Sequence, residues 1–221
     1  GTNVVVKGSN FPSVCFCKFG DKVATATFVS STEVHCISPV THSKTIATEV
    51  AVSFSGNGQD FTNPENLSFL YAPVPVISKV YPSSGPWEGG TYVTVYGLNL
   101  SPASESLEVL CRFGSTSIAP ATTKSLNVVE CVVPLSESSD SMNSVVEVEV
   151  STNGGIDWSS SGLTYHYQDL PVLEGLQPPA GLELGGNTVL VIGSNFHASP
   201  TLACKCGTTT SYATFISTDR I

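Results

Sequence analysis

Short stretches in which apolar and polar residues alternate run along the whole chain, and turns rich in glycine, proline and asparagine separate them. Alternation with a period of two is typical of β-strands that bury one face. The pattern therefore predicts an all-β protein. The clearest predicted strands are residues 3–7, 14–19, 23–29, 49–54, 67–71, 76–81, 145–150 and 172–177.

The turn at Asn57-Gly58 follows one of these alternating segments, and Asn153-Gly154-Gly155 follows another. Asn-Gly between two alternating segments is the strongest short signal for a β-hairpin, because both turn positions need a positive φ. We therefore expect tight hairpins at these two places.

The landmarks of residues 82–134 recur on both sides of that stretch in the same order. They are Pro82-x-x-Gly85-x-x-x-Gly89-Gly90, Gly97-x-Asn99-Leu100, Cys111-x-Phe113-Gly114 and Cys131-x-x-Pro134. Upstream stand Gly8-Ser-Asn10-Phe11, Cys17-Lys-Phe-Gly20 and Cys36-Ile-Ser-Pro39; downstream stand Pro178-x-x-Gly181-x-x-x-Gly185-Gly186, Gly193-Ser-Asn195-Phe196 and Cys204-Lys-Cys-Gly207. Gly8, Gly97 and Gly193 lie 89 and 96 residues apart, and a period of this size indicates whole domains in tandem.

This ordered set of motifs resembles the IPT/TIG family, the immunoglobulin-like domains shared by plexins, the hepatocyte growth factor receptor and some transcription factors. The resemblance implies tandem immunoglobulin-like β-sandwiches that serve interaction and not catalysis. On this basis we expect a domain without its first strand in residues 1–72, a complete domain in residues 73–169 and the N-terminal half of a third in residues 170–221. Short joins that contain Pro75 and Pro171 favour a semi-rigid rod.

The composition narrows the function classes. Charged residues make up 12% of the chain, Ser and Thr number 53 of 221, and the net charge is −9. Such a chain would repel a phosphate backbone, so nucleic acid is an unsuitable partner. No apolar run reaches the roughly 18 residues that span a bilayer. Seven cysteines favour an oxidising compartment, which here means an extracellular or cell-surface location.

Four of the cysteines occupy matching landmarks. Cys17 and Cys36 are 19 residues apart and Cys111 and Cys131 are 20 apart, which predicts one disulfide per domain; pairs of buried free thiols are the alternative. Zinc is a weaker alternative, since the Cys-x-Cys spacing is shorter than zinc sites use. Cys15 and Cys206 are either small buried apolar side chains or are bonded to another chain or domain. Cys204 occupies the framework position of the third domain, and we expect its partner outside this sequence.

Other candidate sites are few. Asn66-Leu-Ser68 and Asn99-Leu-Ser101 fit the N-glycosylation pattern. Asp60 and Asp157 follow the two Asn-Gly turns, where turn stabilisation is a better reading than a calcium site. The glycine clusters lack the Lys-Ser/Thr of a phosphate loop, so we expect glycines with positive φ. We find no catalytic arrangement, cofactor loop or metal-ligand spacing, and therefore expect no enzyme.

Three functions remain. The first is a non-enzymatic extracellular structural or adhesive protein, in which sandwiches form a rod or the repeating subunit of a surface filament or fibre. Its partners would be copies of itself or further IPT/TIG domains, end to end, with glycans attached. The second is a ligand-binding ectodomain fragment of a plexin-like or growth-factor-receptor-like receptor, with a protein ligand. The third, a carbohydrate-binding accessory domain, would need Trp87 and Trp158 to form a stacking platform.

Overall fold

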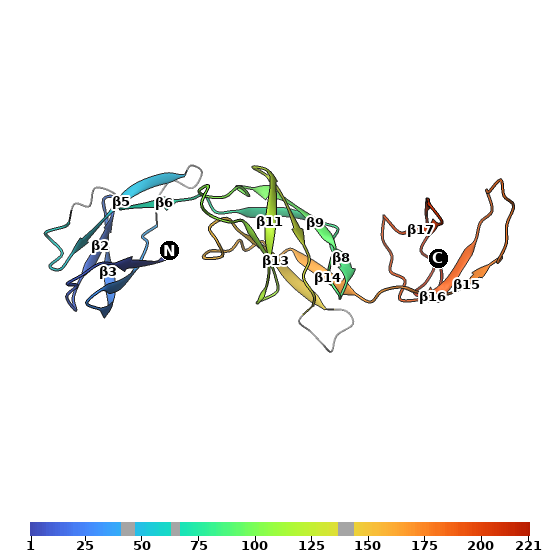
Figure 1. The fold of residues 1–221 in the computed structure, drawn as a ribbon, viewed down its shortest axis with the longest axis horizontal. Helices are drawn as coiled ribbons and strands as arrows, with labels where there is room; N and C mark the ends of the chain where they lie inside the picture. Colours follow the sequence, from blue (N-terminus) through green and yellow to red (C-terminus); the bar gives the residue numbers. More distant parts are fainter. Residues whose placement is uncertain (41–46, 63–66, 137–143) are drawn as a thin grey trace.

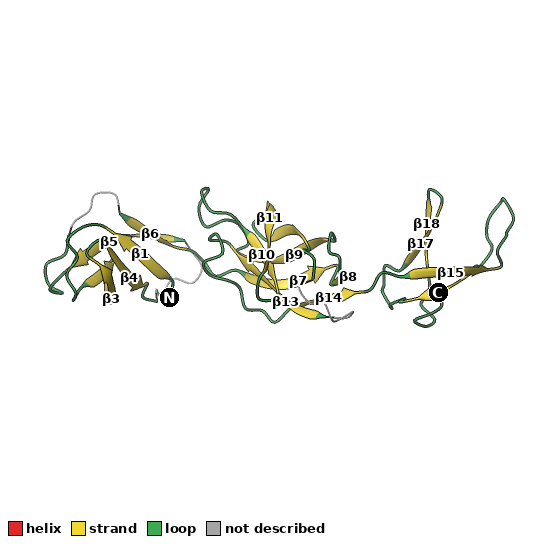
Figure 2. Cartoon of the chain, turned by 60° about the horizontal axis from the view of Figure 1, so that its bottom comes forward, coloured by secondary structure: helices red, strands yellow, loops and turns green. Residues whose placement is uncertain are grey.

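The computed structural model describes residues 1–40, 47–62, 67–136 and 144–221, and these residues form strands and no helix. The strands fall into three groups that follow one another along the longest axis (Figure 1). Figure 2 shows the same three groups from another side, joined by short stretches of loop. The predicted all-β class is confirmed.

The first domain is a sandwich whose strands run in the order β1-β4-β3-β2-β5-β6. Strand β3 belongs to both layers, because residues 22–25 pair with β2 and residues 26–30 pair with β4. The two layers enclose an apolar core between them. The strands are β1 (Asn3–Lys7), β2 (Phe16–Phe19), β3 (Lys22–Ser30), β4 (Glu33–Ile37), β5 (Thr48–Ser55) and β6 (Ser68–Tyr71).

The middle domain repeats this plan with two further strands, in the order β7-β9-β12-β11-β10-β13-β14-β8. Strand β11 changes layer as β3 does: residues 117–120 pair with β10 and residues 121–125 pair with β12. Strand β8 adds to the second layer by pairing in parallel with β14. The strands are β7 (Val76–Tyr81), β8 (Ser84–Pro86), β9 (Tyr92–Leu98), β10 (Leu110–Phe113), β11 (Ser117–Ser125), β12 (Val128–Val132), β13 (Val145–Ser151) and β14 (Thr164–Gln168).

The core of the middle domain follows from the alternation in the sequence. Alternate residues of β9 and β13 point inward, and four of these are fully buried valines: Val93, Val95, Val148 and Val150. Aromatic rings fill the rest: Tyr165 packs edge-on against Phe113 at 5.7 Å and against Tyr167 at 5.2 Å between ring centroids. Burial of this apolar surface is the main force that holds the two layers together.

The third group has two hairpin-like pairs. Strand β15 (Val172–Gln177) pairs with β16 (Leu190–Ser194), and β17 (Ala203–Cys206) pairs with β18 (Thr209–Tyr212). The β15–β16 pair repeats β7–β9, with Leu173 opposite Gly193 as Ile77 is opposite Gly97. Its buried core is small and centres on Val191, Phe196 and Ile221.

The turns agree with the sequence-based prediction at the glycine pairs and differ from it at the Asn-Gly turns. Gly89, Gly90, Gly185 and Gly186 have φ values of 79°, 83°, 73° and 86°, as the turn-glycine reading predicts. The predicted tight hairpin at Asn153-Gly154-Gly155 is wrong, because residues 152–163 separate β13 from β14. The predicted tight hairpin at Asn57-Gly58 is also wrong. Only the glycine has a positive φ, and residues 56–67 separate β5 from β6. The reason is that the Asn57 side chain accepts hydrogen bonds from the amides of residues 59 and 60, which opens a wider loop.

Candidate interaction surfaces

The cysteine pairs join the two layers of the first domain and the two layers of the middle domain. The structure links Cys17 on β2 to Cys36 on β4, and Cys111 on β10 to Cys131 on β12, with Cα–Cα distances of 6.3 and 6.4 Å. All four side chains are buried. Closing a loop of this length restricts the unfolded chain and contributes on the order of 3 kcal/mol to stability.

The remaining cysteines differ in exposure. Cys15 is buried in the core of the first domain, and burial raises the pKa of its thiol. Cys204 is half-buried and Cys206 is exposed. The structure therefore gives Cys15 the surroundings of a small apolar core residue and leaves Cys206 open to solvent. Bonds from these cysteines to another chain stay a prediction.

The loops after β5 and β13 share one hydrogen-bond network. In the middle domain, Asn153 Oδ1 accepts from the Asp157 amide at 2.9 Å, while Asn153 Nδ2 donates to Asp157 Oδ2 at 2.9 Å. Asn57 and Asp60 make the same two contacts in the first domain, at 2.9 and 2.8 Å. The two aspartates stabilise their loops, and the described residues hold no cluster of three or more metal-ligating side chains.

Beside each loop, a cation lies over an aromatic ring. The Arg112 guanidinium is 4.3 Å from the Trp158 ring centroid, and Lys18 Nζ is 5.4 Å from that of Phe61. Trp158 also donates from Nε1 to the Gly155 carbonyl at 3.0 Å. Arg112 covers one face of Trp158, and Trp87 lies beyond β8 instead of in this loop. These positions give little support to a sugar-stacking platform built from the two tryptophans.

An asparagine anchors each join between domains. Asn99 Nδ2 donates to the Val74 carbonyl at 3.0 Å, and Asn195 Nδ2 donates to the Leu170 carbonyl at 3.2 Å. Both asparagines have positive φ, 58° and 61°. A further bond, from Thr2 Oγ1 to Asp157 Oδ2 at 2.7 Å, connects the first and middle domains. These bonds and the prolines that follow the anchored carbonyls restrict the joins.

The structure describes only one of the two asparagines predicted to carry glycans. Asn66 lies outside the described residues. Asn99 is half-buried, and its Nδ2 atom carries the bond to Val74, so a glycan there would replace one of the two hydrogens on that nitrogen. Glycosylation at both positions stays a prediction.

An exposed aromatic face covers β7 and β9 of the middle domain, and sequence reasoning missed it. Lys79 Nζ lies 5.3 Å from the Tyr81 ring centroid and 5.7 Å from that of Tyr96. Tyr92, on the same side of β9, is 74% exposed and lies opposite Val132. We call these five residues the tyrosine face. Tyrosines are enriched at protein interfaces, where they bury large area at low cost in side-chain entropy.

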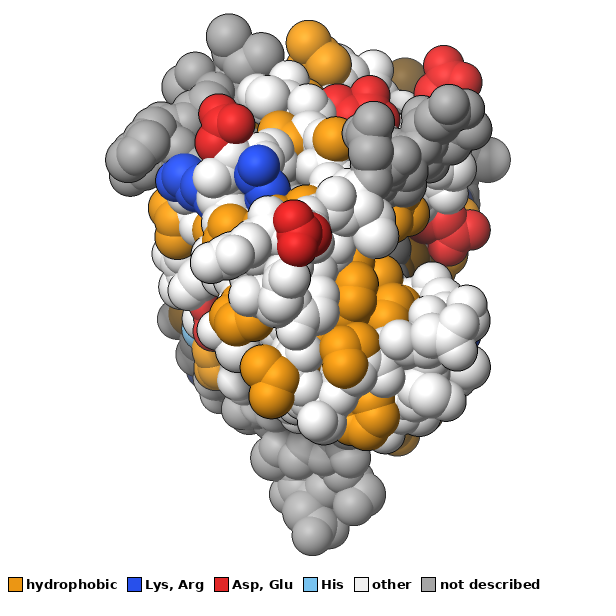
Figure 3. Space-filling model, turned by 90° about the vertical axis from the view of Figure 1, so that its left-hand side faces the viewer, with side chains coloured by type: hydrophobic (Ala, Val, Ile, Leu, Met, Phe, Trp, Pro, Cys, Tyr) orange, Lys and Arg blue, Asp and Glu red, His pale blue; other side chains and the backbone are white. Residues whose placement is uncertain are grey.

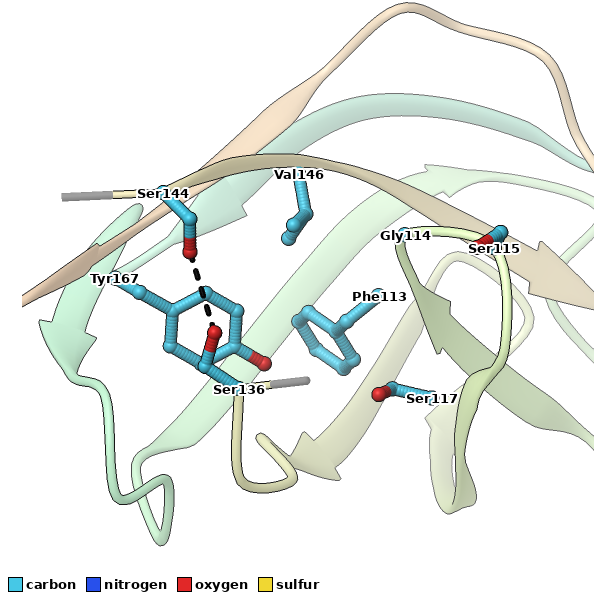
Figure 4. Close-up of a pocket in the computed structure, with 8 residues that line it drawn as sticks. All are labelled: Phe113, Gly114, Ser115, Ser117, Ser136, Ser144, Val146 and Tyr167. Atoms are coloured by element: carbon cyan, nitrogen blue, oxygen red, sulfur yellow. Dashed lines mark hydrogen bonds between the residues drawn. The ribbon is translucent and has the colours of Figure 1, made fainter. Parts of the chain in front are cut away.

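Two hollows on the described surface lie beside aromatic rings. The first domain carries a cavity of about 570 Å³ beside Phe11 and Phe54, and Figure 3 shows apolar side chains gathered on this end of the chain. A second cavity, of about 180 Å³, lies over Phe113 and Tyr167. In Figure 4 serine hydroxyls surround these two rings, and Ser136 Oγ lies 3.2 Å from Ser144 Oγ. This second cavity is smaller than the roughly 300 Å³ that ligand pockets usually have.

Burial raises the pKa of Tyr71 and of Tyr165, and both tyrosines belong to domain cores. The described residues also contain no helix that is long and apolar enough to cross a membrane.

Comparison with known proteins decides the family. The family model for the IPT/TIG domain matches residues 1–71 and 75–167. The chain belongs to the IPT/TIG domain family. The resemblance seen in the motifs is thereby confirmed, including the immunoglobulin-like sandwich fold.

Relatives include two plexins and a fibrocystin. The chain is 27% identical to mouse Plexin-B2 over 124 residues, 56% of this chain and 6% of that protein. It is 26% identical to mouse Fibrocystin-L over 200 residues, 89% of this chain and 4% of that protein. It is 26% identical to human Plexin-A4 over 134 residues, 60% of this chain and 7% of that protein. The chain thus spans less than a tenth of the length of these relatives.

Solved structures of the full extracellular region of plexin A4 are also similar. One covers 100% of this chain and 19% of its own at 16% identity and a TM-score of 0.46; another covers 87% and 26% at 17% identity and 0.43. The two disulfides fit an extracellular domain, because such bonds persist in oxidising compartments. The location outside the cell or at its surface, expected from the cysteines, is confirmed.

Proposed function

We propose that the chain is part of the ligand-binding ectodomain of a plexin-like cell-surface receptor. The observation that carries the proposal is the family match over two tandem domains in a chain whose relatives include plexins. These relatives favour the receptor over the surface filament, the other function expected from the sequence. The chain would then be two IPT/TIG domains and the start of a third, with the domain limits expected above.

In this role the domains bind a protein ligand and act as spacers along the receptor, and they catalyse no reaction. The anchored joins at Asn99 and Asn195 would hold successive domains at a limited range of angles. The tyrosine face offers exposed rings around a lysine that has no carboxylate partner among the described residues. Such a surface suits a protein ligand with an acidic group beside apolar side chains. The net charge of −9 disfavours nucleic acid as a partner, because it would repel a phosphate backbone.

Sedimentation velocity of the purified chain over a wide range of concentrations tests this proposal. A receptor fragment stays a monomer of 23.1 kDa at every concentration. A filament subunit forms species whose mass grows with concentration, and this result would contradict the proposal. The Cys206→Ser variant is the control, because it removes an exposed thiol that could link chains without any designed contact.

A further inference from the structure

The outward surface of the middle domain is apolar beyond the tyrosine face itself. Val76 on β7 lies opposite Leu98 on β9, and the two side chains are 49% and 59% exposed. Alternate residues of a strand share one side of the sheet, so Leu98 faces outward together with Tyr92 and Tyr96. Exposed apolar and aromatic side chains therefore follow β9 over its full length, with Thr94 between them. Large contiguous apolar surface of this kind marks interaction sites on soluble proteins.

The other two repeats keep the core of this strand and differ on its outward face. By the spacings of 89 and 96 residues, every repeat carries valine at both inward positions of β9. The outward positions of Tyr92 and Tyr96 hold Asn3 and Lys7 in the first repeat, and a threonine and an isoleucine in the third. The tyrosines are therefore not needed for the fold of a repeat, and an interaction is the role that their exposure allows.

Lys79 makes the centre of this surface electropositive. Its Nζ atom lies within 6 Å of the Tyr81 and Tyr96 ring centroids, the range in which a ring attracts a cation. Glu130 is the one acidic residue of β7, β9 and β12, and it pairs with Lys124 at 2.8 Å. The charge of Lys79 is thus available to an acidic group of a partner.

A protein partner fits these features better than a sugar or a membrane. A stacking sugar would compete with Lys79 for the rings of Tyr81 and Tyr96. Anionic membranes attract clusters of basic residues, whereas β7, β9 and β12 together contain one lysine. Tyrosines around a single charge are typical of surfaces that bind other proteins.

We propose that the outward surface of β7, β9 and β12 is the docking site for a protein partner that places a glutamate or aspartate over Lys79 and apolar side chains on both sides of it. This inference rests on the proposed function and names the receptor's binding surface. The partner's apolar side chains pack on Tyr92 and Val132 at one end and on Leu98 at the other. The footprint is about 20 Å by about 10 Å. It is the centre of an interface that buries about 800 Å² on each partner.

The test selects random peptides displayed on phage against the whole chain, with counter-selection on the Tyr92→Ser/Tyr96→Ser double variant. The selected peptides should share an acidic residue with apolar residues on both sides. Because buried tyrosines dominate many interfaces, the double variant should bind these peptides at least about tenfold more weakly. Both tyrosines are exposed, so circular dichroism should show the variant folded.

A charge exchange separates recognition from loss of structure. Selection on Lys79→Glu should favour lysine or arginine in place of the acid. Lys124→Glu is the matched control, since it makes the same change of charge on β11 and should leave the selected sequences unchanged. In a synthetic copy of a selected peptide, replacing the acid by glutamine should weaken binding to the native chain about threefold and have no effect on binding to Lys79→Gln.

Three results would overturn the proposal. They are selection that yields no peptides, selected peptides without an acidic residue, and peptides that bind the double variant equally well. Vesicles with phosphatidylserine and immobilised sialylated oligosaccharides are tested in parallel, and binding of either that Lys79→Glu abolishes would overturn the assignment to a protein partner. A chain that polymerises yet selects acidic peptides would refute the receptor assignment alone, and a monomer that selects none would refute the docking site alone.

Discussion

Arg112 donates two hydrogen bonds to one oxygen of Glu149, from Nε at 2.8 Å and from Nη2 at 2.5 Å. The pair joins β10 to β13, its side chains are only 24% and 14% exposed, and Trp158 stacks on the guanidinium. The pair therefore connects the sheet to the loop that contacts Thr2 of the first domain through Asp157.

Glu149→Ala should lower the free energy of unfolding of the middle domain by about 2 kcal/mol, since it leaves a half-buried cation without its partner. The more exposed Lys124–Glu130 pair is the matched control, and Glu130→Ala should change the same quantity by less than about 0.5 kcal/mol. Urea denaturation followed by tryptophan fluorescence measures this domain alone, because both tryptophans of the chain, Trp87 and Trp158, belong to it. Equal effects of the two variants would refute the role of the pair.

Asn99 contributes to the stability of the middle domain in two ways, through its hydrogen bond to Val74 and through its tolerance of a positive φ. Asn99→Gly removes the hydrogen bond to Val74 and keeps a residue that tolerates positive φ, so it should cost about 1 kcal/mol. Asn99→Ala loses the bond and also forces an alanine into the left-handed region, which should add about 1 kcal/mol. The same denaturation measurement compares the two. If alanine were no worse than glycine, the φ of 58° would not be a constraint on this position.

Tyr165 should make the stability of the middle domain depend on pH in the alkaline range. Burial raises its pKa, and the Thr91 hydroxyl lowers it by a smaller amount. Above the ordinary tyrosine pKa of about 10, the unfolded chain has lost a proton that the folded domain retains, so stability falls as pH rises through that range. Tyr165→Phe should remove this part of the decline. Urea midpoints measured from neutral pH to above pH 10 check it, and parallel curves for the two proteins would argue against it.

The free cysteines should differ in reactivity. Cys206 is exposed and should react with a thiol reagent in the native protein, whereas Cys15 should react only after denaturation, because it is buried and its pKa is raised. Peptide mass spectrometry after labelling locates the modified residue. Labelling of Cys15 in the native protein would show that it is not part of the core.

Much of the fold could be predicted from local pattern. The strands at 76–81 and 172–177 begin and end where the sequence pattern predicts, and each pairs antiparallel with the next long strand, β9 or β16. The layer change within β3 and β11 could not be predicted, because the alternation continues while the pairing partner changes. The prediction for the Asn57 loop was wrong because the Asn57 side-chain oxygen accepts the hydrogen bonds that a backbone carbonyl would accept in a tight turn.

The candidate surfaces depend on contacts that are distant in sequence. Lys79 meets Tyr96 and Arg112 meets Trp158 only through strand register and loop position, neither of which the spacing of residues reveals. The alternation at Tyr92, Thr94 and Tyr96 does mark an outward face of β9. What it could not show is that Lys79 and Tyr81 of β7 would extend that face.

The most direct test of the receptor assignment uses the native protein and an antibody against residues 1–221. A receptor ectodomain is stained on intact cells, is removed by external protease, needs detergent for extraction and migrates on a reducing gel well above the 23.1 kDa of this chain. Release by salt without detergent, as particles that pellet as polymers, would contradict the account.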